Sequence, residues 1–397
     1  MEVTMKLKKF FSVLLSLTIL ASICAPCYAA DIQSADISPE VQSQMLRILS
    51  SVEHEKDNYG LTSIDFSSIE IGSPIPSYKV QNGALSASDI QLIPLLSEGK
   101  LVSIFYVATL PDGEYYVQLS NELVSSIEAY SSSNSFAIIY DDFGAYIYDN
   151  STLHLLGEAE TMAYSAEDII QHNYMFPSQI ISYPNSTNSL SESSNSISCL
   201  ASTELSAIKP KPIAVNTTLN VEHFTESLAS PMATSSAYLP VEIIQQPSGT
   251  HICWAIAVTS IVNYIFNASN TYEGIVQLFN GGQDTGMVTE NIFYRFNEVF
   301  HTVWLYEYTT KINPSLILTY LNAGYPLYGD FSRTGGAHAV VIRGVNSSTR
   351  TFSVMNPNPT TSGYTSGTFS SSNVLTFISG YSGSSYTLRS YAFPGEI

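Results

Sequence analysis

The stretch SGTHICWAIAVTSIVNYIF, residues 248–266, places one cysteine between a small polar turn and a long apolar run. Behind Cys253 the apolar residues recur near helical spacing and no proline interrupts them, which predicts a buried helix. Ser248, Gly249 and Thr250 are typical of the turn and cap that precede a helix. Cys253 would then lie in the first turn, where helix N–H groups and the helix dipole favour a thiolate. A lone cysteine on an apolar segment is usually an inert core residue, so a catalytic role needs partners.

A second stretch, GGAHAVVIRGVNSSTRTFSVMNPNP at residues 335–359, supplies two candidate partners. Two β-type runs flank the turn-prone NSST, and a hairpin centred on Ser347 would place Ile342 opposite Phe352 and Val340 opposite Val354. The same register places His338 opposite Asn356, with Cβ atoms about 5 Å apart. Either residue alone could simply end a strand. Their matched register predicts that the amide oxygen holds the imidazole N–H.

Cys253, His338 and Asn356 together fit a Cys-His-Asn nucleophilic site. In this interpretation a Cys253 thiolate attacks a carbonyl, His338 protonates the leaving amine and Asn356 orients the imidazole ring. The oxyanion would be bound by the Cys253 N–H and by a side-chain amide from Gln246 or Gln245, just upstream.

His251 is a rival base because it lies two residues before Cys253. The sequence shows no orienting partner for it, which makes His338 the better candidate.

Three segments, QQPSGTHICWAI, GGAHAVVIRGV and VMNPNP, resemble the signatures of papain-like cysteine peptidases. The closest likeness is to the secreted bacterial staphopain-like and C39-like branches, over about residues 240–397. The resemblance implies an α+β papain-like fold, with a helical subdomain led by Cys253, a β-rich subdomain carrying His338 and Asn356, and a cleft between them. It also implies the oxyanion role for Gln246. Because the usual glutamine-to-cysteine spacing is one residue shorter than here, the choice between Gln245 and Gln246 stays open.

The N-terminus is typical of an export signal. A basic head is followed by an apolar run from Phe10 to Ile23, which is too short to span a bilayer, and then by CYAA at residues 27–30. Residues 1–30 are therefore predicted to be a signal peptide. The protein is expected to be secreted, with no membrane association after cleavage, and the family resemblance implies a Gram-positive bacterial source.

Residues 31–177 are predicted to form a β-rich prodomain that starts with a helix in residues 31–60. Two β-type runs surround Pro111-Asp112-Gly113, and two more surround Asp142-Phe143-Gly144, which indicates two hairpins. Nothing in this part suggests catalytic chemistry. By analogy with secreted cysteine peptidases, it would act as an intramolecular inhibitor of the catalytic site.

Residues 178–236 are rich in Ser, Asn, Thr and Pro, without a clear period, and predict a flexible linker or processing region. Residues 237–397 form the predicted catalytic domain. After the helix at Cys253, it should contain helices near 289–300 and 313–323 and then strands, an order that favours an α+β fold.

The formal net charge of −19 argues against nucleic-acid binding, which requires a basic face. Residues 31–236 contain 25 acidic and six basic side chains, whereas residues 237–397 contain eight and six. No HExxH, CxxC, P-loop or GxGxxG motif is present, so no metal or other cofactor is predicted.

The sequence thus predicts a secreted papain-like cysteine endopeptidase, made as a zymogen, that acts on protein or peptide substrates. One alternative is a related amide hydrolase that acts on leader or cell-wall peptides. The other is a non-catalytic secreted binding protein built on a peptidase scaffold.

Overall fold

The computed structural model describes residues 37–81, 84–130, 135–141, 144–149, 152–158, 205, 208–219, 221, 235–333, 336–357 and 364–395. The predicted signal peptide and most of the predicted linker, including Cys199, lie outside these ranges.

The predicted N-terminal helix is present as α2 (Pro39–Val52). Ser38 caps it by accepting a hydrogen bond from the Val41 N–H, and Pro39 stands in the first turn, where its missing N–H costs nothing. Val41, Met45, Ile48 and Leu49 form its buried face. The chain continues as a 3₁₀ segment, η1 (Glu53–Tyr59).

The N-terminal region is mainly β, as predicted. Its strands are β1 (Ile69–Gly72), β2 (Ser77–Gln81), β3 (Ala84–Ala87), β4 (Ile90–Ser97), β5 (Lys100–Thr109), β6 (Tyr115–Ser120), β7 (Ser135–Tyr140), β8 (Gly144–Tyr148) and β9 (Leu153–Glu158). A short helix, α3 (Val124–Tyr130), follows β6. β5 pairs with β6 and β7 pairs with β8, both antiparallel, so the two predicted hairpins are confirmed.

Part of the predicted linker forms strands, and for these residues the prediction was wrong. β10 (Lys211–Pro212) pairs with β7, and β11 (Val215–Leu219) pairs with β1. The β-branched and apolar residues in VNTTL complete the edge of an existing sheet, so tertiary pairing outweighs the polar composition.

The C-terminal region contains the predicted helices and one that the sequence did not indicate. The helices are α7 (Cys253–Phe266), α8 (Tyr272–Asn280), α9 (Thr289–Phe300) and α10 (Pro314–Asn322), of which α8 is the additional one. The strands are β12 (Ser236–Tyr238), β13 (Trp304–Tyr308), β14 (Leu327–Arg333), β15 (Gly336–Asn346), β16 (Thr351–Met355), β17 (Tyr364–Thr368), β18 (Thr376–Ser379) and β19 (Ser384–Pro394). None of the helices in the described ranges combines the length and apolar character needed to cross a bilayer.

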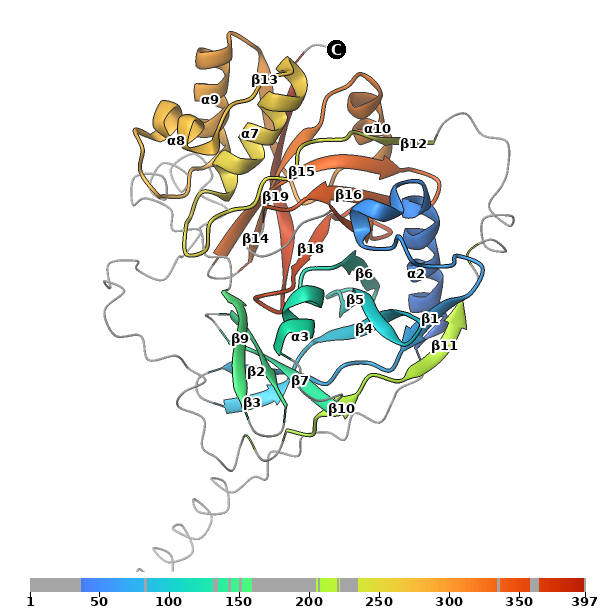
Figure 1. The fold of residues 1–397 in the computed structure, drawn as a ribbon. Helices are drawn as coiled ribbons and strands as arrows, with labels where there is room; N and C mark the ends of the chain where they lie inside the picture. Colours follow the sequence, from blue (N-terminus) through green and yellow to red (C-terminus); the bar gives the residue numbers. More distant parts are fainter. Residues whose placement is uncertain are drawn as a thin grey trace, which may run out of the picture. The chain divides into compact units, whose positions relative to one another are not determined.

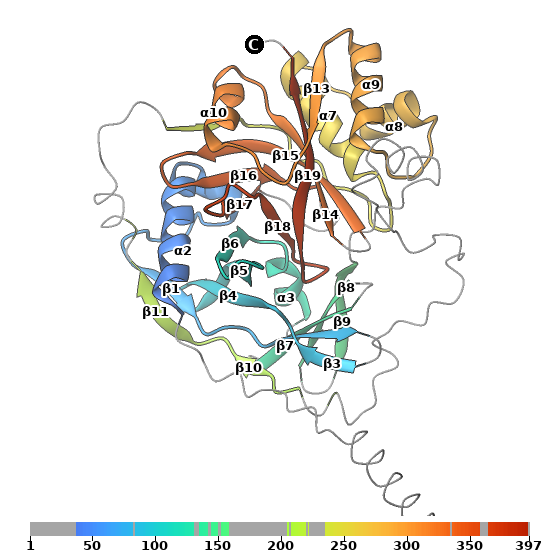
Figure 2. The same ribbon diagram turned by 180° about the vertical axis from the view of Figure 1, so that it is seen from behind.

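The two regions share one sheet. Within the described residues it has 13 strands, with the main order β11-β1-β4-β5-β6-β17-β16-β15-β14-β19-β13. β6 of the N-terminal region pairs antiparallel with β17 of the C-terminal region, where Leu119 faces Ser366 and Gln118 faces Gly367. Figures 1 and 2 show the blue-green strands continuing into the orange and red ones at this pair.

The hydrophobic core is shared as well. A single cluster of buried side chains extends from Ile37 to Ala392, and a smaller cluster lies beside the second sheet, whose order is β3-β2-β7-β8-β9. Ser34–Ile397 accordingly form one compact unit. The architecture is mixed helix and sheet, in agreement with the predicted fold class.

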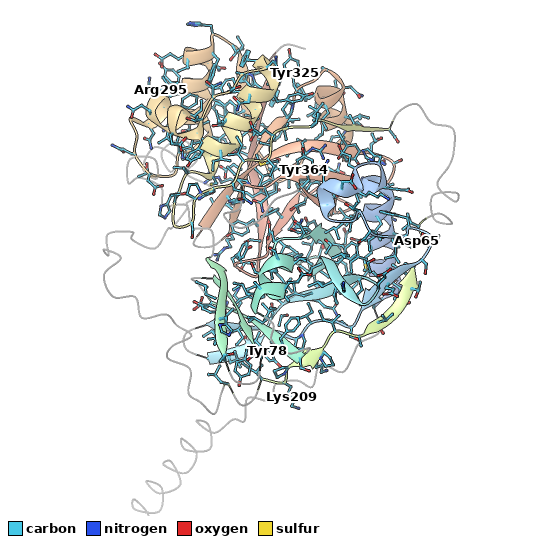
Figure 3. All side chains as sticks on the ribbon, in the orientation of Figure 1. Asp65, Tyr78, Lys209, Arg295, Tyr325 and Tyr364 are labelled. Atoms are coloured by element: carbon cyan, nitrogen blue, oxygen red, sulfur yellow. The ribbon has the colours of Figure 1, made fainter. Side chains whose placement is uncertain are left out.

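An ion pair between a buried arginine and a partly buried glutamate joins the two regions beside the shared sheet. Arg343 of β15 is fully buried and donates to both carboxylate oxygens of Glu55 in η1, each at 2.8 Å. Its guanidinium also lies 3.8 Å from the centroid of the Tyr364 ring. In Figure 3 Tyr364 lies where the C-terminal strands meet the N-terminal helical segment.

Removing the acid should destabilise the whole unit, because Arg343 would remain buried without its counter-charge. We expect Glu55→Ala to lower the free energy of unfolding by about 3–5 kcal/mol, measured by urea denaturation. Glu298→Ala, which breaks the exposed pair with Arg295, is the matched control and should cost less than about 1 kcal/mol. Equal losses in the two variants would contradict a structural role for the Arg343–Glu55 pair.

Candidate active site

The predicted contact between His338 and Asn356 is present. His338 lies near the start of β15 and Asn356 directly follows β16, and His338 Nε2 is 2.6 Å from Asn356 Oδ1. Both side chains are buried, with exposed fractions of 0% and 3%. Because an amide oxygen can only accept, Nε2 carries the hydrogen and Nδ1 is the basic nitrogen of the neutral ring.

The register that led to this prediction was wrong by three residues next to the turn and by two on the His338 side of a bulge. Ile342 faces Val354 rather than Phe352, and Phe352 faces Val345. Arg343 is an extra residue at a bulge between Ile342 and Gly344. A shift of two keeps each side chain on its predicted face, so the imidazole still reaches the amide, now as a diagonal neighbour.

The His338 ring lies in an aromatic environment. It stacks on Phe377 with ring centroids 5.6 Å apart, and Tyr386 approaches edge-on at 6.4 Å. Burial lowers the pKa of His338 from 6.5 to about 4, although the bond to Asn356 and the charge of Asp330 both act to raise it. The ring is therefore neutral at pH 7 in this state.

Cys253 is the first residue of α7, as predicted. Its side chain is buried, with an exposed fraction of 3%, and it is not in a disulfide. The helix cap is Ile252, which makes no side-chain bond to the helix, whereas Thr250 closes a separate turn with Pro247. The first-turn position favours the thiolate over the thiol.

Helix α7 packs against β15 and β14, so the cysteine-bearing helix lies on the strand that carries His338. Tyr328 of β14 lies close enough to Cys253 to be affected by its charge. Burial raises its pKa well above the ordinary value, and the charges of Asp330 and Cys253 raise it further. Asp330 also acts on His338, so its charge reaches both Tyr328 and the His338 ring.

The two candidate glutamines differ in their surroundings. Gln246 is buried, its backbone N–H donates to Pro357 O at 3.1 Å, and its Nε2 donates to Thr250 O at 2.5 Å. These bonds link the segment that leads to Cys253 with the residue after Asn356. Gln245 is exposed, so only Gln246 has a fixed side-chain amide in this region.

The rival base His251 does have an acidic neighbour, contrary to the expectation from sequence. Asp284 Oδ1 accepts a hydrogen bond from the His251 backbone N–H at 2.7 Å and lies 3.9 Å from His251 Nδ1. The residues are 33 positions apart, and the loop after α8 brings them together, which local sequence could not indicate. The His251 side chain is partly exposed, at 22%, unlike His338.

Sequence reasoning missed a buried carboxylate beside the His338–Asn356 pair. Asn356 Nδ2 donates to Glu122 Oε1 at 2.5 Å, and the Gly380 N–H donates to Glu122 Oε2, also at 2.5 Å. Glu122 lies between β6 and α3 of the N-terminal region and is 1% exposed. One sequence signal pointed to Glu122, its position next to the apolar Leu123. This signal is weak because the region is rich in acidic residues.

A comparison with known families found a match in the C-terminal region. Residues 235–373 match the model of a family described as papain-like cysteine protease AvrRpt2. The chain is a cysteine peptidase. The match confirms the resemblance to papain-like peptidases, identifies a hydrolase and spans Gln246, Cys253, His338 and Asn356. No curated protein matches the chain.

The low pKa of His338 predicts a specific loss of stability in acid. The unfolded chain binds a proton with the ordinary pKa of 6.5, whereas the folded chain does so only near pH 4. Because the unfolded state binds more protons in this window, the free energy of unfolding should fall as the pH drops from about 6.5 to about 4, by about 3 kcal/mol in total.

Urea denaturation across this pH range measures the effect. His338→Gln should remove this component of the pH dependence, whereas His301→Asn, at an exposed histidine, should leave the wild-type slope. A wild-type slope in His338→Gln would show that His338 does not titrate in this way.

Proposed function

We propose that the protein is a secreted endopeptidase that hydrolyses peptide bonds through Cys253, His338 and Asn356. The observation that carries the proposal is the buried bond from His338 Nε2 to Asn356 Oδ1, on a strand packed against the helix that Cys253 begins. This bond fixes the tautomer in which Nδ1 can accept the thiol proton. In the papain-like arrangement, α7 leads a helical subdomain and β15 and β16 belong to a β-rich one, with the substrate between them.

The reaction then follows from these groups. The Cys253 proton moves to His338 Nδ1, and the thiolate attacks the peptide carbonyl carbon. The Cys253 N–H and Gln246 Nε2 donate to the oxyanion of the tetrahedral intermediate. The imidazolium gives its proton to the leaving amine as the C–N bond breaks, which leaves a thioester. His338 next takes a proton from water, whose oxygen attacks the thioester, and the acid product leaves as the thiol reforms.

The precursor form of this enzyme would be inactive, with the N-terminal region acting as its intramolecular inhibitor. The exposed fractions of Cys253, His338, Asn356 and Gln246 are 5% or less, so a peptide has no access to the sulfur in this state. The low pKa of His338 also disfavours the thiolate–imidazolium pair at neutral pH. Activation therefore requires a rearrangement that admits substrate and water.

We place the activating cut between β11, which ends at Leu219, and β12, which starts at Ser236. β11 is an integral strand of the N-terminal region and β12 pairs with β15 of the catalytic region, so a cut between them leaves both regions intact. The segment includes the polar sequence SLASPMATS, residues 227–235, which is typical of protease-sensitive sequence. The basic and apolar segment in residues 1–30 supports export, and the resemblance to secreted bacterial peptidases supports a Gram-positive source.

Replacing the nucleophile tests the proposal directly. Cys253→Ala should abolish peptide hydrolysis, self-processing between residues 219 and 236, and labelling by a thiol-directed epoxide. Purified precursor would be incubated under reducing conditions, and its fragments identified by mass spectrometry. Normal processing of purified Cys253→Ala would assign the cut to another protease, and peptidase activity in that variant would refute the nucleophile.

The oxyanion role separates the two neighbouring glutamines. Gln246→Ala should lower kcat by about 10²–10³-fold, with KM little changed, because the lost donor acts mainly on the transition state. Gln245→Ala is the control, since that side chain is exposed, and should keep kcat within about twofold. A larger loss in Gln245→Ala than in Gln246→Ala would reverse the assignment.

A further inference from the structure

Glu122 belongs to the N-terminal region, yet its carboxylate is hydrogen-bonded to residues of the C-terminal region. One carboxylate oxygen accepts from Asn356 Nδ2 and the other from the Gly380 N–H. Its backbone oxygen accepts from the Tyr381 hydroxyl at 2.8 Å. These contacts connect residue 122 to both the residue after β16 and the turn between β18 and β19.

The carboxylate determines which way the Asn356 amide points. An amide has an oxygen end and an NH₂ end of nearly the same shape, and a flip exchanges them at little steric cost. A carboxylate only accepts, so Glu122 requires the NH₂ end of Asn356, which turns Oδ1 towards His338 Nε2. The flipped amide would point its NH₂ group at the Nε2–H of the ring, so that two donors would face each other. This favours the tautomer with the hydrogen on Nδ1, and in that tautomer Nδ1 cannot accept the proton of Cys253.

The site around Glu122 fits a carboxylate closely. A Cβ added to Gly380 would lie 2.4 Å from Glu122 Oε2, so only glycine allows the backbone N–H to approach this oxygen. The Gly380 N–H is a fixed donor, so any side chain that replaces Glu122 must place an acceptor at the position of Oε2. Burial raises the pKa of Tyr106 and Tyr140 above the ordinary value, and the nearby charge of Glu122 raises both further.

We infer that Glu122 is a positioning residue for catalysis, which sets the orientation of Asn356 and, through it, the tautomer of His338. The inference rests on the proposed function of the His338–Asn356 pair. It implies that the N-terminal region remains bound after the linker is cut and supplies part of the working site. The pairing of β6 with β17 and the two bonds between the Gln118 side chain and the Ile378 backbone, at 2.6 and 2.8 Å, hold it there.

An exchange of the two polar groups tests the inference. In Glu122→Gln the new side chain must turn its oxygen to the Gly380 N–H and its NH₂ to Asn356, which forces the amide to flip. In Asn356→Asp two carboxylates face each other. In the double variant the new carboxylate at position 356 accepts both from the new glutamine and from His338 Nε2, so the native hydrogen-bond pattern returns.

We expect each single variant to lower kcat of the processed enzyme by at least about 10²-fold. KM should change little, since the Glu122 side chain is buried. The double variant should return to within about tenfold of wild type. Glu114→Gln is the matched control, because Glu114 also joins the two regions, through bonds to Ser371, but is only partly buried. It should keep wild-type kcat, and thermal melts should show that all four variants are folded.

A second measurement does not depend on activity. In a Cys253→Ala background, imidazole ¹⁵N shifts should place the His338 hydrogen on Nε2 in the parent and in the double exchange, and on Nδ1 after Glu122→Gln. A hydrogen that stays on Nε2 in Glu122→Gln, or a double exchange no better than the worse single variant, would overturn the inference. If the wild-type enzyme hydrolyses no peptide, the proposed function fails, and the tautomer still decides whether Glu122 positions Asn356.

Discussion

The hydrogen bond between His338 Nε2 and Asn356 Oδ1 is the interaction on which the proposed chemistry of this protein depends. It needs two strands that meet at the correct register, an aromatic environment that keeps water from the ring, and an amide that points the right way. The first two conditions are met within the C-terminal region. The third is met from outside it, because the carboxylate that orients the amide belongs to the segment between β6 and α3.

Local patterns predicted much of the fold and most of the candidate site. The helix behind Cys253, the helix at residue 39 and the two N-terminal hairpins all follow from periodicity and turn chemistry, which act over a few residues. The His338–Asn356 contact was predicted with the wrong register, because the turn spans residues 347–350 and centres the hairpin beyond Ser347, and the bulge at Arg343 then shifts the pairing by one more residue. The predicted face of the sheet was still correct for His338 and Asn356, because a register shift of two residues leaves each side chain on the same face.

The features that local patterns did not reveal all involve distant pairs. β11 lies in a polar stretch and becomes a strand because β1 offers an open edge. The Asp284 neighbour of His251 and the Glu122 neighbour of Asn356 are 33 and 234 positions away along the chain. No periodicity links such residues, so only the folded arrangement could assign them.

The pairing of β6 with β17 has a consequence for how the catalytic region could exist alone. Without its neighbour, β17 would present a row of unsatisfied N–H and C=O groups at an open sheet margin, and such margins recruit strands from other molecules. Residues 236–397 produced separately should therefore self-associate. The N-terminal region would serve as the template on which this margin is closed during biosynthesis, in the manner of an intramolecular chaperone.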